Sequence, residues 1–357
     1  MFFSVYALDA GVPLYLMAGQ MIMSGFHGTD IGSEWMNSMG EQIREGYLGG
    51  VILFDYNIPQ KEEFHRLISY LQSQSWIPLL IAIDQEGGRV SRLDPKKGYG
   101  KYPSQKAVAE LSLEEAKKTY GKMAAELRKY GVNLNLAPVV DIDYNPTSPA
   151  IGAMERSFSK DPDRVMEYAK IFIDAHENEG LLTALKHFPG QGRSLGDTHN
   201  KIEDLTGQWK KDELIPFINL TLDRETVLIM TAHTYNKELD PDYPATLSKP
   251  TIDSLLRQEN VDVAIISDDI QMGAIQENYT FEETVVGAVN AGVDILLFSN
   301  NPRAWPENKD FQPDPYVAQR AVEIILAAVK DGRIEISSLE NSFRRIMKIK
   351  ENIGKKL

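Results

Sequence analysis

Short runs of apolar residues recur along most of the chain, and each run ends in polar or glycine-containing sequence. Within a run, Val, Ile and Leu occupy successive positions and do not alternate with polar residues. This pattern is typical of parallel strands that are buried on both faces, because a half-exposed strand alternates. Eight runs are predicted as strands, at residues 20–26, 49–54, 78–84, 132–143, 181–188, 226–233, 261–269 and 293–299.

Helical patterns separate most of these runs. Apolar residues at three- and four-residue spacing predict helices within 61–75, 111–131, 161–180, 251–260, 280–292 and 315–332. Ser112, followed three positions later by Glu115, has the sequence of a capping box and predicts where the second of these helices begins. Several of the patterns end in glycine, as helices that lead into a strand usually do.

Eight strands alternating with helices predict an α/β fold, a (β/α)8 barrel of the TIM type. We expect a single barrel domain over residues 1–357, with strands from about 20 to 299 and closing helices at about 313–357. A doubly wound parallel sheet is the alternative. The number of strands favours the barrel, as does the absence of a linker rich in Pro, Gly and Ser that would divide the chain.

The amino-acid composition limits the kinds of partner that this chain is expected to bind. The chain is 43% hydrophobic and 25% charged, the balance of a soluble globular protein. With 51 acidic and 38 basic side chains its formal net charge is −13, so we do not expect it to bind nucleic acid. It has no cysteine, which excludes disulfides, thiolate catalysis and cysteine-bound metals. No apolar stretch reaches the roughly 20 residues of a membrane span.

The N-terminal sequence MFFSVYALDAGVPLYLMAGQMIMSGF is apolar, but Asp9, Gly11 and Pro13 interrupt it. The first Lys or Arg of the chain is Arg44, so this segment lacks the charged start of a signal peptide. We therefore expect a cytoplasmic protein. The alternative is an exported or periplasmic protein in which FFSVYALDA is the remnant of a trimmed signal. We also expect a monomer.

Ionisable residues gather where the predicted strands end. In a barrel the loops that follow the strands converge at one face, and the chemistry takes place there. The strand ends supply Asp84, Asp141, Asp143, Lys186, His187, His233, Asp268 and Asp269. Polar residues are common at strand ends, but here most of the strand ends carry a charged or imidazole side chain, which is more than chance would give. We expect these side chains to face one small bowl.

The segment 186–200, KHFPGQGRSLGDTHN, follows the fifth strand with a flexible, polar loop. Asp197 stands two residues before His199, whose intrinsic pKa near ~6.5 suits proton transfer near neutrality. Asp197 could orient the imidazole ring. An ordinary polar surface loop is the alternative.

An acidic bowl with such a loop suits the hydrolysis of a neutral polar substrate such as a sugar. Glycoside cleavage requires a carboxylate for the oxocarbenium-like centre, which Asp268 or Asp269 could supply, and an acid for the leaving oxygen.

No cofactor or metal is expected. The glycines of GQGRSLG lack the dinucleotide-binding spacing, and HENE at 176–179 lacks the second histidine of a zinc-protease helix. His65 and His176 are assigned to helix surfaces.

Six motifs occur in order: IAIDQEGGRVSRL, LAPVVDID, ERSF, LKHFPGQGRSLGDTH, MTAH…PATLS and SDDIQMGAI. Through them the chain resembles the single-domain β-N-acetylglucosaminidases (β-N-acetylhexosaminidases) of glycoside hydrolase family 3, from about residue 15 to about 300. The resemblance implies a retaining exo-enzyme that removes terminal β-linked N-acetylglucosamine through a covalent glycosyl-aspartate. Peptidoglycan fragments are the first expected substrate and chitooligosaccharides the second.

The resemblance also implies roles for individual residues. The nucleophile is the first aspartate of SDD, Asp268, and the acid/base is His199, paired with Asp197. The residues implied to hold the sugar are Asp84, Arg92, Arg156, Lys186 and His187. Asp269 is interpreted as structural, and His233 is given no part in the reaction.

One position departs from the family pattern. The family has KHFPGHG, and Gln191 replaces its second histidine. That residue shapes the loop and does not transfer the proton, so we expect catalysis to survive. Two alternatives remain open. One is a glycoside phosphorylase, because a histidine acid/base repels phosphate less than a carboxylate does. The other is a sugar-binding barrel whose catalysis has decayed.

Overall fold

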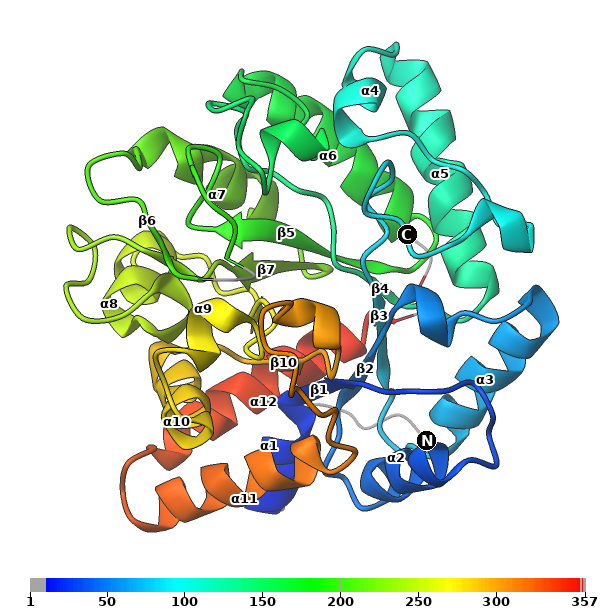
Figure 1. Cartoon of the computed structure of the whole chain (residues 1–357), viewed down its shortest axis with the longest axis vertical. Helices are drawn as coiled ribbons and strands as arrows, with labels where there is room; N and C mark the ends of the chain where they lie inside the picture. Colours follow the sequence, from blue (N-terminus) through cyan, green and yellow to red (C-terminus); the bar gives the residue numbers. More distant parts are fainter. Residues whose placement is uncertain (1–10, 199–200, 354, 356–357) are drawn as a thin grey trace.

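Eight short parallel strands form the centre of the molecule, and helices surround them (Figure 1). The computed structural model describes residues 11–198, 201–353 and 355, so His199 lies outside the described residues. The strands are β1 Ile22–Gly25, β2 Gly50–Leu53, β3 Leu80–Ile83, β4 Leu134–Asn135, β5 Leu182–Phe188, β7 Val227–Thr231, β9 Ile265–Ile266 and β10 Leu296–Phe298. Each lies within one of the eight predicted runs.

The strands follow one another around a barrel in the order β10-β1-β2-β3-β4-β5-β7-β9. The two ends of this order meet at a parallel bridge between Ile266 and Ile295. The (β/α)8 prediction is therefore confirmed, and the doubly wound alternative is wrong.

Side chains complete the seam between β9 and β10. The backbone N–H groups of Leu297, Ser299 and Asn300 donate to side-chain oxygens, at 2.9, 3.0 and 2.7 Å respectively. The acceptors are the side chains of Ser267, Asp269 and Gln271. At these positions a side chain takes the place that a backbone carbonyl has in an ordinary ladder.

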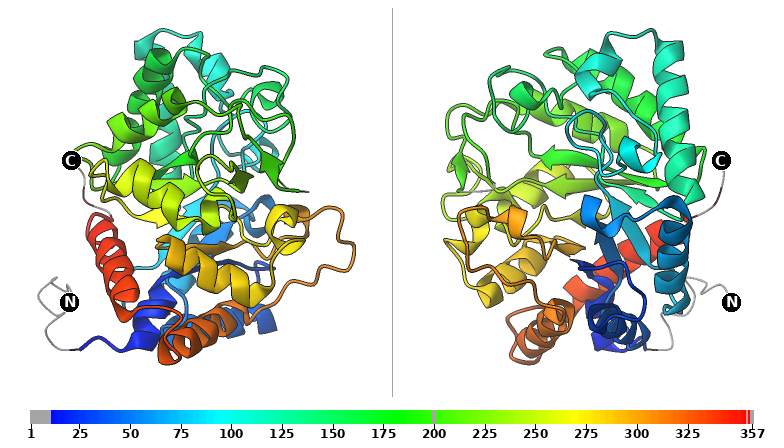
Figure 2. Two further views of the ribbon diagram at one scale, coloured as in Figure 1. Left: turned by 90° about the vertical axis from the view of Figure 1, so that its left-hand side faces the viewer. Right: turned by 45° about the vertical axis from the view of Figure 1, so that its right-hand side comes forward.

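The helices pack on the outside of the strands, as Figure 2 shows from two further sides. They are α1 Leu14–Gln20, α2 Glu34–Arg44, α3 Lys61–Ser73, α4 Gln105–Ala109, α5 Leu113–Lys129, α6 Pro162–Glu177, α7 Ile215–Thr221, α8 Lys249–Ile252, α9 Gly273–Gln276, α10 Phe281–Ala291, α11 Val317–Lys330 and α12 Ile336–Lys350. The predicted capping box is present, because the Ser112 and Glu115 side chains each accept the other's backbone N–H. Over the described ranges, no helix has both the length and the apolar character to cross a membrane.

His176 is buried on α6, and the prediction that it lies at the surface is wrong. Its Nδ1 lies 2.8 Å from the Phe172 carbonyl and its Nε2 lies 3.0 Å from Nδ2 of Asn135. Burial lowers its pKa to about 4, so the ring is neutral. Asn135 also exchanges hydrogen bonds with the backbone of Gln85, on the loop that follows β3. The buried histidine thus supports the loop that carries Asp84.

A second, two-stranded parallel sheet was not predicted. It pairs β6 Glu203–Asp204 with β8 Thr234–Tyr235 and lies beside the barrel (Figure 1). Both strands belong to connections that leave the carboxyl ends of β5 and β7. The sheet therefore stands next to the loop that contains Asp197.

Candidate active site

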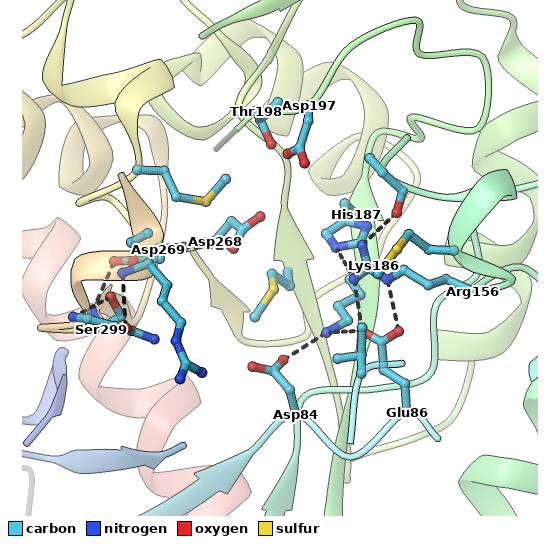
Figure 3. A pocket seen from close by; sticks show the side chains of 18 of the residues that line it. Asp84, Glu86, Arg156, Lys186, His187, Asp197, Thr198, Asp268, Asp269 and Ser299 are labelled. Atoms are coloured by element: carbon cyan, nitrogen blue, oxygen red, sulfur yellow. Dashed lines mark hydrogen bonds and ion pairs between the residues drawn. The ribbon is translucent and has the colours of Figure 1, made fainter. Parts of the chain in front are cut away.

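A polar cavity of about 360 Å³ opens at the carboxyl ends of the strands (Figure 3). Its lining comes from loops far apart in the sequence, which follow β2, β3, β4, β5, β9 and β10. It includes Phe54, Asp84, Glu86, Arg89, Arg92, Arg156, Lys186, His187, Gln191, Asp197, Thr198, Asp268, Asp269, Ser299 and Arg303. This is the bowl that the strand ends predict.

One wall of the cavity is a network of paired charges, here called the charged wall: Asp84, Glu86, Arg92, Arg156 and Lys186. Lys186 Nζ lies 2.8 Å from Asp84 Oδ1 and 2.7 Å from Glu86 Oε1. Arg156 grips Glu86 with two hydrogen bonds, of 2.9 and 2.8 Å. Arg92 Nη2 lies 3.1 Å from Asp84 Oδ2. The wall thus fixes donors and acceptors in a rigid arrangement.

The charges of this wall persist over a wide pH range. Burial alone would raise the pKa of Asp84 and of Glu86, but the neighbouring cations outweigh burial and hold both pKa values well below their usual range. The same carboxylates raise the pKa of Lys186 and of Arg156 against the effect of burial. The wall therefore presents carboxylate acceptors and cationic donors to a ligand.

His187 lies beside the charged wall and is held by Asp141. Its Nδ1 is 2.7 Å from Asp141 Oδ2, and its backbone N–H donates to the same oxygen at 3.1 Å. Its Nε2 faces the guanidinium of Arg156 at 3.2 Å. A carboxylate at Nδ1 and a donor at Nε2 place the ring proton on Nδ1. Asp141 also accepts the N–H of Gln191 at 2.9 Å, so it supports the start of the loop after β5.

Asp268 and Asp269 follow β9 on the other side of the cavity. The Asp268 carboxylate is directed into the cavity (Figure 3), and its Oδ1 accepts the N–H of Asp269 at 2.8 Å. Asp269 is buried and accepts the N–H groups of Gln271 and Ser299, at 3.1 and 3.0 Å. Burial raises the pKa of Asp269 to about 6. Asp269 has the contacts of a structural residue, whereas Asp268 faces the space that a ligand would occupy.

Asp197 and Thr198 also line the cavity, above Asp268 and His187 in Figure 3. The structure thus brings together seven of the predicted site residues: Asp84, Arg92, Arg156, Lys186, His187, Asp197 and Asp268. Three other strand-end residues are not in the lining: Asp141, which is buried behind His187, and Asp143 and His233. His233 is buried against Thr246 and the backbone of Asp269, and Asp143 lies 3.8 Å from Lys106.

Glu86 is the member of the charged wall that was not predicted. Its side chain is buried and bridges Lys186 and Arg156. Its place in the motif DQEGG, two residues after Asp84, was the available signal. The spacing within this motif does not distinguish Glu86 from a solvent-exposed loop carboxylate, because its partners Arg156 and Lys186 lie far away in the sequence.

A second buried carboxylate, that of Glu213, contacts the loop after β5 at Gly192 and Arg193. Its Oε2 accepts the N–H of Gly192 at 3.1 Å, and Arg193 Nε lies 3.2 Å from its Oε1. Burial and the nearby Asp141 raise its pKa to about 7, although Arg193 acts in the opposite direction. This residue gives the loop a pH-dependent anchor.

The folded state should therefore lose stability as the pH rises through about 7. The pKa of Glu213 is raised from 4.5, so between these values the folded protein binds a proton that the unfolded chain does not. Glu213→Gln removes this titration. Urea unfolding at pH 5 and pH 8 should show wild type losing on the order of 2 kcal/mol more than the variant. An equal pH dependence in both proteins would contradict this prediction.

Carboxylates and cations around a polar cavity at the strand ends of a barrel are the arrangement that glycoside-cleaving barrel enzymes use. The comparison with known families agrees, because the model of the glycosyl hydrolase family 3 N-terminal domain matches residues 15–349. The chain belongs to this family. The predicted family and the predicted class, a glycoside hydrolase, are confirmed.

Relatives and solved structures agree with this assignment. Beta-hexosaminidase A of Pseudoalteromonas piscicida is 31% identical over 344 residues, 88% of this chain and 55% of that protein. A beta-hexosaminidase of Tolumonas auensis is 34% identical over 268 residues, 73% of this chain and 78% of that one. A family 3 β-N-acetylglucosaminidase from Paenibacillus sp. superposes with a TM-score of 0.85 at 30% identity, over 96% of this chain and 63% of that one. The chain thus spans little more than half the length of some relatives that it matches.

Proposed function

We propose that this protein is a retaining exo-β-N-acetylglucosaminidase that acts through a covalent glycosyl-Asp268 intermediate. The observation that carries the proposal is the cavity, in which Asp268, the loop of Asp197 and the charged wall surround one space. The names of the relatives, beta-hexosaminidase and β-N-acetylglucosaminidase, support the choice of sugar.

In the first step, the Asp268 carboxylate attacks the anomeric carbon, and the bond from this carbon to the leaving oxygen breaks. The leaving oxygen takes a proton from His199, whose ring Asp197 orients. In the second step, His199 removes a proton from water, and the resulting oxygen attacks the same carbon. The bond to Asp268 breaks, and the sugar leaves with its original anomeric configuration.

The charged wall holds the sugar in this scheme. An ammonium group has three N–H donors, and the contacts of Lys186 with Asp84 and Glu86 use two of them. Arg156 directs donors to Glu86, to His187 and to the Ala150 carbonyl, and these contacts account for four of its five. Counted over the described residues, Lys186 and Arg156 each keep one N–H for a hydroxyl or acetamido oxygen, while Asp84 accepts from a hydroxyl group.

As physiological substrates we propose glycans with terminal N-acetylglucosamine, first peptidoglycan fragments and second chitooligosaccharides. Both present the same terminal sugar to the cavity, and they differ in the group that leaves.

The test is the release of nitrophenol from its β-glycosides of N-acetylglucosamine and of glucose. We expect the N-acetylglucosaminide to be cleaved much faster, and a preference for the glucoside would overturn the proposed substrate. Parallel reactions with phosphate identify the sugar product. Free N-acetylglucosamine indicates hydrolysis, and the sugar 1-phosphate indicates a phosphorylase. Binding without turnover indicates a decayed enzyme.

A further inference from the structure

Backbone N–H groups of the loop after β5 are held by three acidic side chains from other parts of the chain. Asp141 and Glu213 accept the N–H groups of Gln191 and Gly192, near the beginning of the loop. Glu203 holds its far end, because Oε1 of this residue accepts the N–H of Leu195 at 2.6 Å and that of Gly196 at 2.9 Å. The next residue is Asp197, which lines the cavity.

The Glu203 carboxylate is buried, with 8% of the residue exposed, and it lies directly against Gly196. A Cβ atom placed on Gly196 would come within 2.3 Å of Oε2 of Glu203. The next two nearest atoms, at 3.2 and 3.7 Å, also belong to Glu203. Glycine at position 196 is thus matched to this one side chain.

Glu203 also connects the loop after β5, through β6 and β8, to the backbone next to Asp268. It lies on β6, where it pairs with Thr234 of β8. His233, the residue before Thr234, has its Nε2 2.9 Å from the backbone carbonyl of Asp269. The contacts therefore run from Gly196 through Glu203 and β8 to the end of β9. A second, longer contact is the 3.4 Å hydrogen bond that the N–H of Ala274, on α9, donates to the carbonyl of Thr198.

We infer that Glu203 is a positioning residue that fixes Asp197 relative to Asp268. The inference rests on the proposed function, because it takes Asp197 and Asp268 as the two sides of the reaction. Glu203 is not itself in the lining of the cavity. It acts through the backbone of Leu195 and Gly196, and its charge strengthens both hydrogen bonds.

The first test compares Glu203→Ala with wild type on an N-acetylglucosamine disaccharide and on an activated aryl glycoside. Misplacement of the acid by about 1 Å costs roughly 10²-fold, so we expect kcat on the disaccharide to fall by about that factor. The glycosylation step on the aryl glycoside, whose leaving group needs little protonation, should change far less. KM should stay close to wild type because the charged wall is untouched.

Two matched variants accompany this measurement. Glu203→Gln keeps the shape and one oxygen acceptor, so it should recover part of the lost kcat. Asp204→Asn is the control, since the carboxylate of this exposed neighbour on β6 accepts the N–H of Thr206 at 2.8 Å and not that of Leu195 or Gly196. It should leave kcat unchanged. A Glu203→Ala variant that slows both substrates equally, or acts through KM, would overturn the inference.

The second test is a double-mutant cycle between positions 196 and 203. Gly196→Ala drives a methyl group into the carboxylate and should lower kcat on the disaccharide. In Gly196→Ala combined with Glu203→Ala the methyl group has space, so the loss should be smaller than the product of the two single losses. Losses that multiply would contradict a direct contact. Gly196→Ala and Glu203→Gln, both measured against wild type, decide the question even if Glu203→Ala folds poorly, which thermal unfolding would detect.

Asp268→Asn, measured in parallel, distinguishes a failure of the proposed function from a failure of the role given to Glu203. If Asp268→Asn keeps wild-type turnover, the proposed function is wrong. If Asp268→Asn is inactive while the variants at 196 and 203 behave like wild type, only the role of Glu203 is wrong.

Discussion

Replacement of Asp268 by Asn is expected to lower turnover by several orders of magnitude, because the covalent route loses its nucleophile. An amide of the same shape can occupy the cavity but cannot form the glycosyl ester. Folding should be nearly unchanged, since the side chain is partly exposed and faces the cavity. Steady-state rates on the aryl N-acetylglucosaminide, with thermal unfolding alongside, measure both effects.

Asp269→Asn is the matched control for this experiment. Its carboxylate is buried and accepts two backbone N–H groups, so its loss should act mainly on stability. If Asp269→Asn abolished turnover without unfolding the protein while Asp268→Asn kept it, the nucleophile would be Asp269.

Removal of His199 should reduce activity in proportion to how poor the leaving group is. General acid/base assistance is typically worth about 10²–10⁴-fold, so His199→Ala should lose roughly that factor on natural disaccharides. On activated aryl glycosides the glycosylation step should suffer far less. The covalent intermediate should then accumulate for want of a base, and added azide should restore turnover by attacking the trapped sugar.

Asp197→Ala should give a milder form of the same pattern, because the imidazole remains but loses its orientation. Wild-type behaviour of His199→Ala on every substrate would make the segment GDTH an ordinary polar loop. Rates on both classes of substrate, with and without azide, are the measurement.

The barrel could be predicted from the sequence because strands buried on both faces leave continuous apolar runs. The same reasoning located Asp84, Lys186 and Asp268, since the carboxyl ends of parallel strands meet at one face of a barrel. The resemblance to family 3 motifs supplied Arg92 and Arg156, which no strand end indicates.

The parts that escaped prediction depend on contacts between distant residues. Glu86 owes its place to Arg156, 70 positions later, and the pairing of β6 with β8 joins two loops. His176 was misplaced because its polarity was given more weight than its spacing from Phe172. The i, i+4 relation puts both on the buried face of α6.

At position 191, where the family pattern has histidine and this chain has glutamine, the structure shows a backbone hydrogen bond that anchors the loop. Gln191 lines the cavity, and its backbone N–H donates to Asp141. This hydrogen bond uses only backbone atoms at position 191, so the anchor is independent of the side chain there. The start of the loop is therefore held in the presence of glutamine.

The seam between β9 and β10 has a consequence for how such a barrel can change in evolution. Backbone ladders are common to all residues, so a substitution seldom alters them. Here the side chains of Ser267, Asp269 and Gln271 accept the N–H groups of the facing strand and loop, and all three residues lie within three positions of Asp268. A single substitution in this stretch can therefore shift the position of Asp268 while the other seven strand junctions stay intact. Substitutions at these three side chains could therefore change the position of Asp268 during evolution without changing the rest of the barrel.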